Sequence, residues 1–233
     1  MLFRSLQTKA DVLEFFNVDE NKIHVIHFPA SPIFTPIHDE AFDAAVKKKF
    51  TLDFPFALFV GQIEPRKNII ALVKAFELLH STYKTELHLV LVGRRGWLYR
   101  EIFDSINRSP LRSKIHYLEY VPDVELSSLY RHAEFFIYPS LYEGYGSPVL
   151  EAMTSGVAVI TSKSSSLQEI WGNAALLVDP NNVEEIAHAL QTLHQNESKR
   201  IELSKLGLEH VKAFSSQAAA DSVLRLYKSL MSQ

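Results

Sequence analysis

The chain has 233 residues, of which 47% are hydrophobic and 22% are charged, as expected for a soluble globular protein with one well-formed core. Its 24 lysine and arginine residues face 27 aspartate and glutamate residues, and the net charge of −3 provides no broad attraction to nucleic acid or anionic lipid. The absence of cysteine excludes disulfide bonds, thiolate catalysis and cysteine-ligated zinc.

The first 50 residues contain two short segments with regular patterns. A helix is predicted near Lys9–Phe16 and a strand over Lys22–Phe28. Prolines at positions 29, 32 and 36 then indicate a linker that leads to another short helix. No complete domain fits into residues 1–50.

The N-terminal segment has no apolar core of signal-peptide length, and it carries an acid as early as Asp11. No uncharged apolar run approaches the roughly 18 residues that a membrane-spanning helix requires. We therefore expect a cytoplasmic protein that is neither exported nor membrane-spanning, and that is at most peripheral at the inner face of the membrane.

Short apolar runs of strand length recur from residue 56 onward, and segments with helical spacing of apolar residues separate them. The runs are Phe56–Val60, Leu87–Val92, Ile115–Leu118, Phe135–Tyr138, Val157–Thr161 and Ala174–Val178. Nearly continuous apolar strands joined by helical crossovers are what a parallel sheet covered on both faces requires. We predict a doubly wound, Rossmann-like α/β domain over residues 55–195.

The remainder of the chain is predicted to be a helical C-terminal tail. Three helical segments are expected over Val183–Leu193, Lys199–Phe214 and Ser216–Met231, with breaks at Asp179-Pro180 and at Phe214-Ser215.

In a doubly wound sheet, ligands bind outside the carboxyl ends of the strands. After the first apolar run, the segment Gly61–Asn68 brings Arg66 and Lys67 to the start of a helix, an arrangement that suits a diphosphate. An adjacent Arg-Lys pair is more often a pair of solvated loop charges, and the position at a strand end is what favours binding. The segments Gly93–Trp97 and Glu119–Asp123 follow the next two runs and are weaker signals.

The segment Glu143–Glu151 follows the fourth run and carries the strongest signal. Gly144 and Gly146 allow backbone N–H groups to approach a ligand closely. Ser147 followed by Pro148 is typical of a helix N-cap and first helical residue, so a helix is expected to begin at residue 147 or 148.

Two carboxylates flank this glycine loop, one before it and one on the first helical turn. Glu143 alone would usually be a solvated loop acid, and Glu151 alone a first-turn acid favoured by the helix dipole. Carboxylates are, however, good acceptors for vicinal hydroxyls. Two diols on either side of a diphosphate describe a nucleotide sugar.

The segment Glu143–Glu151 resembles the E-x7-E motif of the retaining glycosyltransferases of family GT4, which have the GT-B fold of two facing Rossmann-like domains. The resemblance extends over residues 5–231 and includes Pro65–Asn68, Tyr138–Ser140 and Leu176–Pro180. It implies that residues 51–233 form the donor-binding domain, the C-terminal half of a GT-B fold. Residues 1–50 would then be a remnant of the N-terminal domain and the interdomain linker.

The resemblance also implies roles for individual residues. Lys67 matches the lysine that contacts the diphosphate, and Arg66 beside it is the second cation. Glu143 matches the catalytic-site carboxylate that holds the donor sugar, and Glu151 the carboxylate that binds the ribose.

The remaining implied donor-binding residues contact the ligand through backbone or apolar surface. Val121 matches a position against the base, and the loop whose backbone meets sugar hydroxyls and phosphate comprises Gly144, Tyr145, Gly146 and Ser147. The chain departs from the family at Gln62, where many members have an arginine, and at Ser216, where many have a tryptophan.

The activity implied is a retaining transfer of a sugar from a nucleotide diphosphate to a glycan or lipid-linked acceptor. No cofactor or metal is expected, because Lys67, Arg66 and the helix at Ser147 would neutralise the leaving diphosphate. The Pro-Arg-Lys-Asn and Gly-x-x-Gly-Trp features look most like mannosyltransferases of bacterial polysaccharide assembly. GDP-mannose is the donor we favour, with a UDP-sugar as the alternative.

Two interpretations of the chain remain open. It is either part of a glycosyltransferase, inactive by itself because a missing N-terminal domain or a separate subunit presents the acceptor, or a stand-alone nucleotide-sugar-binding module. A dinucleotide fingerprint is disfavoured because Gly144–Gly146 lacks a third glycine. The histidines show no metal-binding spacing, and no Gly-x-Ser-x-Gly nucleophile is present.

Overall fold

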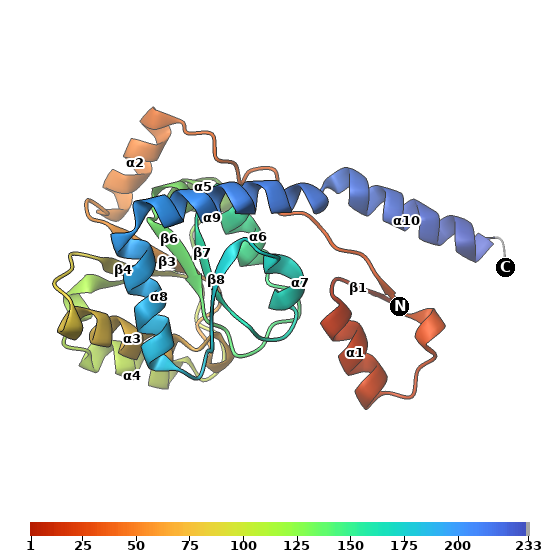
Figure 1. Ribbon diagram of the computed structural model, residues 1–233, viewed down its shortest axis with the longest axis horizontal. Helices are drawn as coiled ribbons and strands as arrows, with labels where there is room; N and C mark the ends of the chain where they lie inside the picture. Colours follow the sequence, from red (N-terminus) through yellow and green to blue (C-terminus); the bar gives the residue numbers. More distant parts are fainter. Residues whose placement is uncertain (232–233) are drawn as a thin grey trace.

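The computed structural model describes residues 1–231 and contains a six-stranded parallel sheet between two layers of helices (Figure 1). The strand order is β5-β4-β3-β6-β7-β8. In chain order the strands are β3 (Phe56–Val60), β4 (His88–Val92), β5 (Ile115–Leu118), β6 (Phe135–Tyr138), β7 (Val159–Ser162) and β8 (Ala175–Val178). This is the doubly wound order, in which successive strands are added in one direction from β3 to β5 and in the opposite direction from β6 to β8. The predicted Rossmann-like fold is confirmed.

Helices α3, α4 and α8 pack together against one face of the sheet, and α5, α6 and α9 lie on the other, with α7 beside α6 (Figure 1). Their bounds are α3 (Ile69–Thr82), α4 (Tyr99–Arg108), α5 (Asp123–His132), α6 (Ser147–Thr154), α7 (Leu167–Trp171), α8 (Val183–Gln195) and α9 (Glu197–His210).

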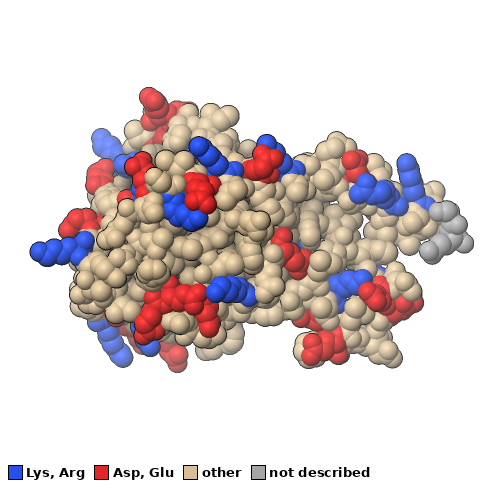
Figure 2. Space-filling model, in the orientation of Figure 1, with Lys and Arg blue, Asp and Glu red and all other residues tan. Residues whose placement is uncertain are grey.

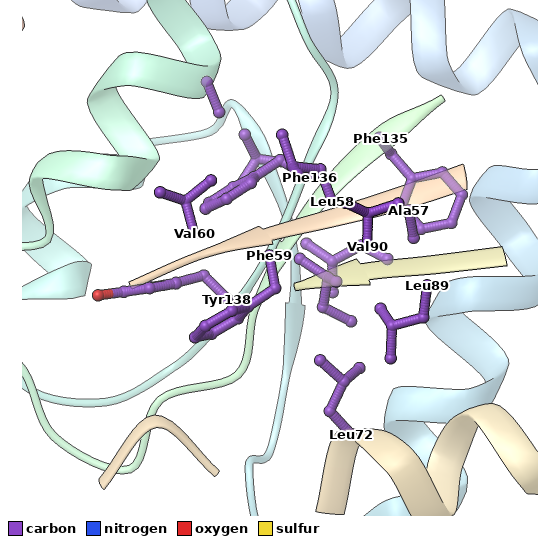
Figure 3. Packing of buried hydrophobic residues seen from close by; sticks show 14 of the residues in the cluster. Ala57, Leu58, Phe59, Val60, Leu72, Leu89, Val90, Phe135, Phe136 and Tyr138 are labelled. Carbon is purple, nitrogen blue, oxygen red and sulfur yellow. The ribbon is translucent and has the colours of Figure 1, made fainter. Parts of the chain in front are cut away.

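The core forms where the central strands meet these helices. All five residues of β3 are buried, because this central strand is covered on both faces. Helix α3 buries apolar residues at helical spacing, and its Leu72 lies below Phe59 and Leu89 in Figure 3. Each large apolar side chain buried in this way stabilises the fold by about 1.5–3 kcal/mol.

The predicted strands of the main sheet agree with the structure to within two residues, the largest difference being β7, which begins at Val159. The strand expected over Lys22–Phe28 is wrong in extent: β2 comprises only His24–Val25 and pairs with β1 (Leu2–Phe3). A strand extends only as far as it has a partner, and β1 offers two residues.

Two helical boundaries also differ from the sequence expectation. Helix α1 (Leu6–Phe15) begins three residues earlier than predicted because Ser5 caps it by accepting a hydrogen bond from the N–H of Thr8. The helix expected over Lys199–Phe214 ends at His210, and a 3-10 turn, Val211–Ala213, follows it.

Helix α2 (Glu40–Phe50) joins the main domain through a buried ion pair. Both oxygens of Asp43 accept hydrogen bonds from the guanidinium of Arg131 on α5, at 3.1 and 2.5 Å. Both side chains are nearly inaccessible to solvent, and the paired guanidinium outweighs burial so that the pKa of Asp43 is lowered.

Helix α10 (Ser216–Met231) extends away from α9 toward the segment that contains β1, α1 and β2 (Figure 1). Within residues 1–231, no helix combines the length and apolar character needed to cross a membrane. Basic and acidic side chains are interspersed on the face shown in Figure 2, which agrees with the small net charge.

Candidate functional site

A cavity of about 500 Å³ lies outside the carboxyl ends of β3 and β6, at the point where the strand order reverses. This is the position at which doubly wound sheets bind ligands. Seven of the nine predicted site residues line it: Arg66, Lys67, Glu143, Gly144, Tyr145, Gly146 and Ser147. Val121 and Glu151 are not among the residues that line this cavity.

The two cations lie in a turn of their own between β3 and α3. A 3-10 turn spans Pro65–Lys67, and Asn68 then adopts a left-handed conformation with φ of 60°. The Asn68 amide donates hydrogen bonds to the carbonyls of Pro139 and Pro180 at 3.1 and 2.6 Å, which ties the cation turn to two neighbouring loops. The cations therefore lie immediately before α3, at the start of a helix as the sequence had indicated.

Lys67 and Glu143 form a buried ion pair in the wall of the cavity. The Lys67 Nζ lies 2.5 Å from Glu143 Oε1, and the two residues are 4% and 5% exposed. Lys67 also donates to the hydroxyl of Tyr138. Burial lowers the pKa of Lys67, and the Glu143 carboxylate offsets only part of that effect.

Arg66 forms an ion pair with the second carboxylate oxygen of Glu143. Its guanidinium lies 2.8 Å from Glu143 Oε2, and its Nε lies 2.6 Å from a carboxylate oxygen of Glu64, which is 5% exposed. Burial opposes the charge of Arg66, but these carboxylates outweigh it and raise the pKa of the guanidinium. Both oxygens of the carboxylate assigned to the donor sugar are thus held by the two cations assigned to the diphosphate.

The glycine loop leads into α6, which begins at Ser147 as predicted. The N-cap is Gly146 rather than Ser147, so the predicted capping pair was one residue too late. Gly146 has a φ of 93°, and a Cβ at this position would approach Leu167 to 2.6 Å. Only glycine satisfies both the left-handed turn and this close contact.

Neighbouring segments hold the glycine loop in place from two sides. The backbone N–H of Glu143 donates a hydrogen bond of 2.8 Å to the Ser165 hydroxyl, and the Ser166 hydroxyl donates one of 2.7 Å to the Glu143 carbonyl. On the other side, the hydroxyls of Ser5 and Thr8 donate to the Gly144 carbonyl at 2.6 and 3.1 Å. The loop is therefore fixed between α1 and the start of α7.

The side chain of Tyr145 reaches from the cavity wall to the N-terminal segment. It is 4% exposed, and its hydroxyl donates a hydrogen bond of 2.5 Å to the carbonyl of Phe28. Burial raises the pKa of this hydroxyl to about 12. The side chain joins the N-terminal segment to the loop, which fits the expectation that the loop presents backbone groups.

Glu151 lies one turn into α6, where its carboxylate accepts a hydrogen bond of 3.0 Å from the Tyr130 hydroxyl. Burial raises the pKa of Glu151 to about 7, the Tyr130 hydrogen bond opposes this, and the charge of Asp123 adds to it.

Val121 lies three residues after the end of β5 and is 3% exposed, so its side chain belongs to the hydrophobic core. Next to it, Tyr120 is exposed, and the guanidinium of Arg94 lies 4.6 Å from the centre of its ring. The two weaker sequence signals, the loops after β4 and β5, thus meet at this edge of the sheet.

Six residues that line the cavity were not among the predicted site residues: Arg4, Gly61, Gln62, Tyr138, Tyr142 and Pro148. Tyr138 ends an apolar strand, and the family resemblance included it without giving it a binding role. Arg4 lies outside every motif, and only the packing of the N-terminal segment brings it to the cavity. Among residues 1–231, no group of three or more His, Asp or Glu side chains is arranged to hold a metal ion.

Comparison with known proteins places this geometry in a family. Residues 42–210 match the model of the family described as glycosyl transferases group 1. The chain is 36% identical over 225 residues to the O-antigen chain mannosyltransferase B of Escherichia coli, covering 96% of this chain and 58% of that protein.

Two solved structures resemble the fold. Sucrose-phosphate synthase from Thermosynechococcus elongatus superimposes with a TM-score of 0.83 at 26% identity, over 99% of this chain and 58% of that one. A glycosyltransferase from Rickettsia africae ESF-5 superimposes with a TM-score of 0.85 at 22% identity, over 99% of this chain and 63% of that one. The chain belongs to the glycosyl transferases group 1 family.

Proposed function

We propose that this chain is the donor-binding part of a retaining glycosyltransferase that transfers mannose from a nucleotide diphosphate, GDP in our proposal, to a glycan or lipid-linked acceptor. The 36% identity to an O-antigen chain mannosyltransferase supports the choice of mannose. Retention at the anomeric carbon and the roles of the two carboxylates follow from the likeness of Glu143–Glu151 to the E-x7-E motif.

One observation carries this proposal: Arg66, Lys67 and the glycine loop at the start of α6 line one cavity at the reversal point of the sheet. Cations and the N-terminus of a helix together stabilise a diphosphate and its developing charge when it leaves. These groups would do so without a divalent metal.

The buried ion pair suggests how Glu143 becomes available to the sugar. In the structure Glu143 neutralises Lys67 and Arg66. A bound diphosphate would compete for the same cations, because its charge is larger and its oxygens accept hydrogen bonds in the same geometry. The Glu143 carboxylate would then turn to the sugar hydroxyls, which are donors for its freed oxygens.

The Glu151 carboxylate would accept hydrogen bonds from the hydroxyls of the ribose. Its pKa of about 7 implies that part of the protein carries a neutral carboxyl there at pH 7. A ribose diol that donates two hydrogen bonds favours the ionised form, so binding would shift this pKa downward.

Calorimetry with GDP, UDP, ADP and dTDP tests the proposal. We expect binding of at least one of them and a loss of affinity of about tenfold or more in Lys67→Ala and Glu151→Ala, because each removes a charged hydrogen bond. Glu184→Ala on the outer surface of α8 serves as control and should bind as the parent does. Absence of heat with all four diphosphates would overturn the proposal.

The chain spans 58% of the length of its O-antigen relative. We propose that a domain outside these 233 residues presents the acceptor, so that the chain alone binds donor and transfers no sugar. Incubation with labelled GDP-mannose and a mannan acceptor checks this, and transfer by the chain alone would contradict it.

A further inference from the structure

The charges of the two cations in the donor cavity are already balanced by acids of the protein. Lys67 and Arg66 are paired with Glu143 and Glu64 at distances between 2.5 and 2.8 Å. Both acids are 5% exposed and cannot leave for solvent without rearrangement of the loops. Two positive and two negative charges leave this wall of the cavity with no net charge to attract a diphosphate.

Arg4 supplies a cation to the same cavity that is not balanced in this way. It lines the cavity, and the centre of its guanidinium lies 5.2 Å from the centre of the Tyr145 ring. Within the part of the chain that the structure describes, no carboxylate lies within ion-pairing distance of it. The side chain is exposed, so its guanidinium can reach a ligand without first being desolvated.

Several hydrogen bonds fix the backbone beside Arg4 against the glycine loop. The next residue, Ser5, is fully buried and donates to the Gly144 carbonyl at 2.6 Å. The carboxylate of Glu169 on α7 accepts from the N–H groups of Leu6 and Gln7 at 2.7 and 2.8 Å, which anchors the first turn of α1. These hydrogen bonds therefore fix the backbone beside Arg4 against the glycine loop, although Arg4 lies near the N-terminus.

We propose that Arg4 is a diphosphate-binding residue of this site, which rests on the donor-binding function proposed above. A guanidinium presents a planar pair of N–H groups that matches two phosphate oxygens. The guanidinium lies over the Tyr145 ring in a cation–π contact, and the exposed side chain remains accessible to a ligand. Arg4 then provides the net positive charge, while Lys67 and Arg66 exchange Glu143 for phosphate.

Titration of the protein with UDP and GDP by calorimetry tests this assignment in Arg4→Gln, Arg4→Lys and Lys67→Ala. We expect Arg4→Gln to lower the affinity for the diphosphate that binds by about tenfold or more, the loss of one charged hydrogen-bonding partner. Arg4→Lys should lose less, because it keeps the charge but not the planar pair of donors. Inorganic pyrophosphate should compete with the nucleotide in the parent and more weakly in Arg4→Gln.

The matched control is Arg108→Gln, which removes the same charge from the exposed end of α4 and should bind as the parent does. The melting temperature of each variant without ligand verifies folding, and an exposed Arg4 should change it little. If Arg4→Gln binds the nucleotide as tightly as the parent while Lys67→Ala binds it more weakly, the proposed role of Arg4 is overturned and the donor-binding function is not. No binding of either nucleotide to the parent would overturn the donor-binding function together with it.

Discussion

At the carboxyl edge of the main sheet, Lys67 and Glu143 are buried as a charged pair, whereas at the amino edge two half-buried histidines form a hydrogen bond with each other. His88 on β4 and His116 on β5 lie 2.8 Å apart, Nδ1 to Nε2, and the ring of Phe54 stacks on both at 3.8 and 4.6 Å. Burial, with His116 and Lys114 adding to it, lowers the pKa of His88 to about 4.

The two edges of the sheet differ in how they offset the cost of removing titratable groups from water. The histidines remain neutral and share one N–H···N hydrogen bond, so no charge has to be buried. The carboxyl edge instead keeps charged groups out of water and compensates them with each other, which rarely stabilises a fold more than apolar packing does. The buried charges of Lys67 and Glu143 fit the binding role proposed above.

The largest effect is expected from breaking the buried pair. Glu143→Ala should lower the free energy of unfolding by about 3–5 kcal/mol, because it leaves Lys67 buried without its counter-charge. Urea denaturation measures this change. The double variant Lys67→Met, Glu143→Leu should lose less than Glu143→Ala alone. A double variant that loses the sum of the two single effects would show that the pair is not coupled.

A smaller effect is expected in the pH dependence of stability, which should have opposite signs at Glu151 and at His88. Glu151 should show the larger of the two changes. Its folded pKa of about 7 exceeds the ordinary value of 4.5, so its contribution to stability is complete below pH 4.5 and is lost as pH rises through 7. Relative to that of Glu151→Gln, the free energy of unfolding of the parent should fall by about 2 kcal/mol between pH 5 and pH 8. Urea denaturation across this range, with Glu184→Gln as control, checks the slope, and parallel curves would refute it.

The smallest effect should come from the histidine stack, with the reverse sign. The folded pKa of His88, about 4, lies below the ordinary value of 6.5, so its contribution is complete above pH 6.5 and is lost as pH falls toward 4. Relative to that of His88→Gln, the free energy of unfolding of the parent should fall by about 1 kcal/mol between pH 8 and pH 5. The change is small because the ring remains partly in solvent. His188→Gln, an exposed histidine, is the control, and an unchanged slope in His88→Gln would contradict this.

The strands of the main sheet could be predicted because each is a short apolar run whose burial on both faces leaves little choice of structure. The run before Pro29 shows the limit of this reasoning. Its residues are as apolar as those of a strand, but only Leu2 and Phe3 are available to pair with it. A strand depends on a partner that lies elsewhere in the chain.

The site was predictable in position but not in its internal contacts. Parallel strands bring Lys67 and Glu143 to one edge of the sheet whatever their partners are, and both line one cavity there. That Glu143 holds both cations, and that Tyr138 accepts a hydrogen bond from Lys67, depends on side-chain distances that no spacing encodes.

By itself, the sequence determined the α/β class, the extents of the six strands and the loops that gather at one edge of the sheet. These features depend on local hydrophobic pattern and on the short reach of each connection. Only the tertiary structure decided which charges neutralise one another and which remain open to a ligand. Arg4 and Glu143 lie 139 residues apart, with the hydrogen bond from neighbouring Ser5 to Gly144 joining the two segments across the same sequence separation. Contacts of that range form only when the packed core has set the distance between them.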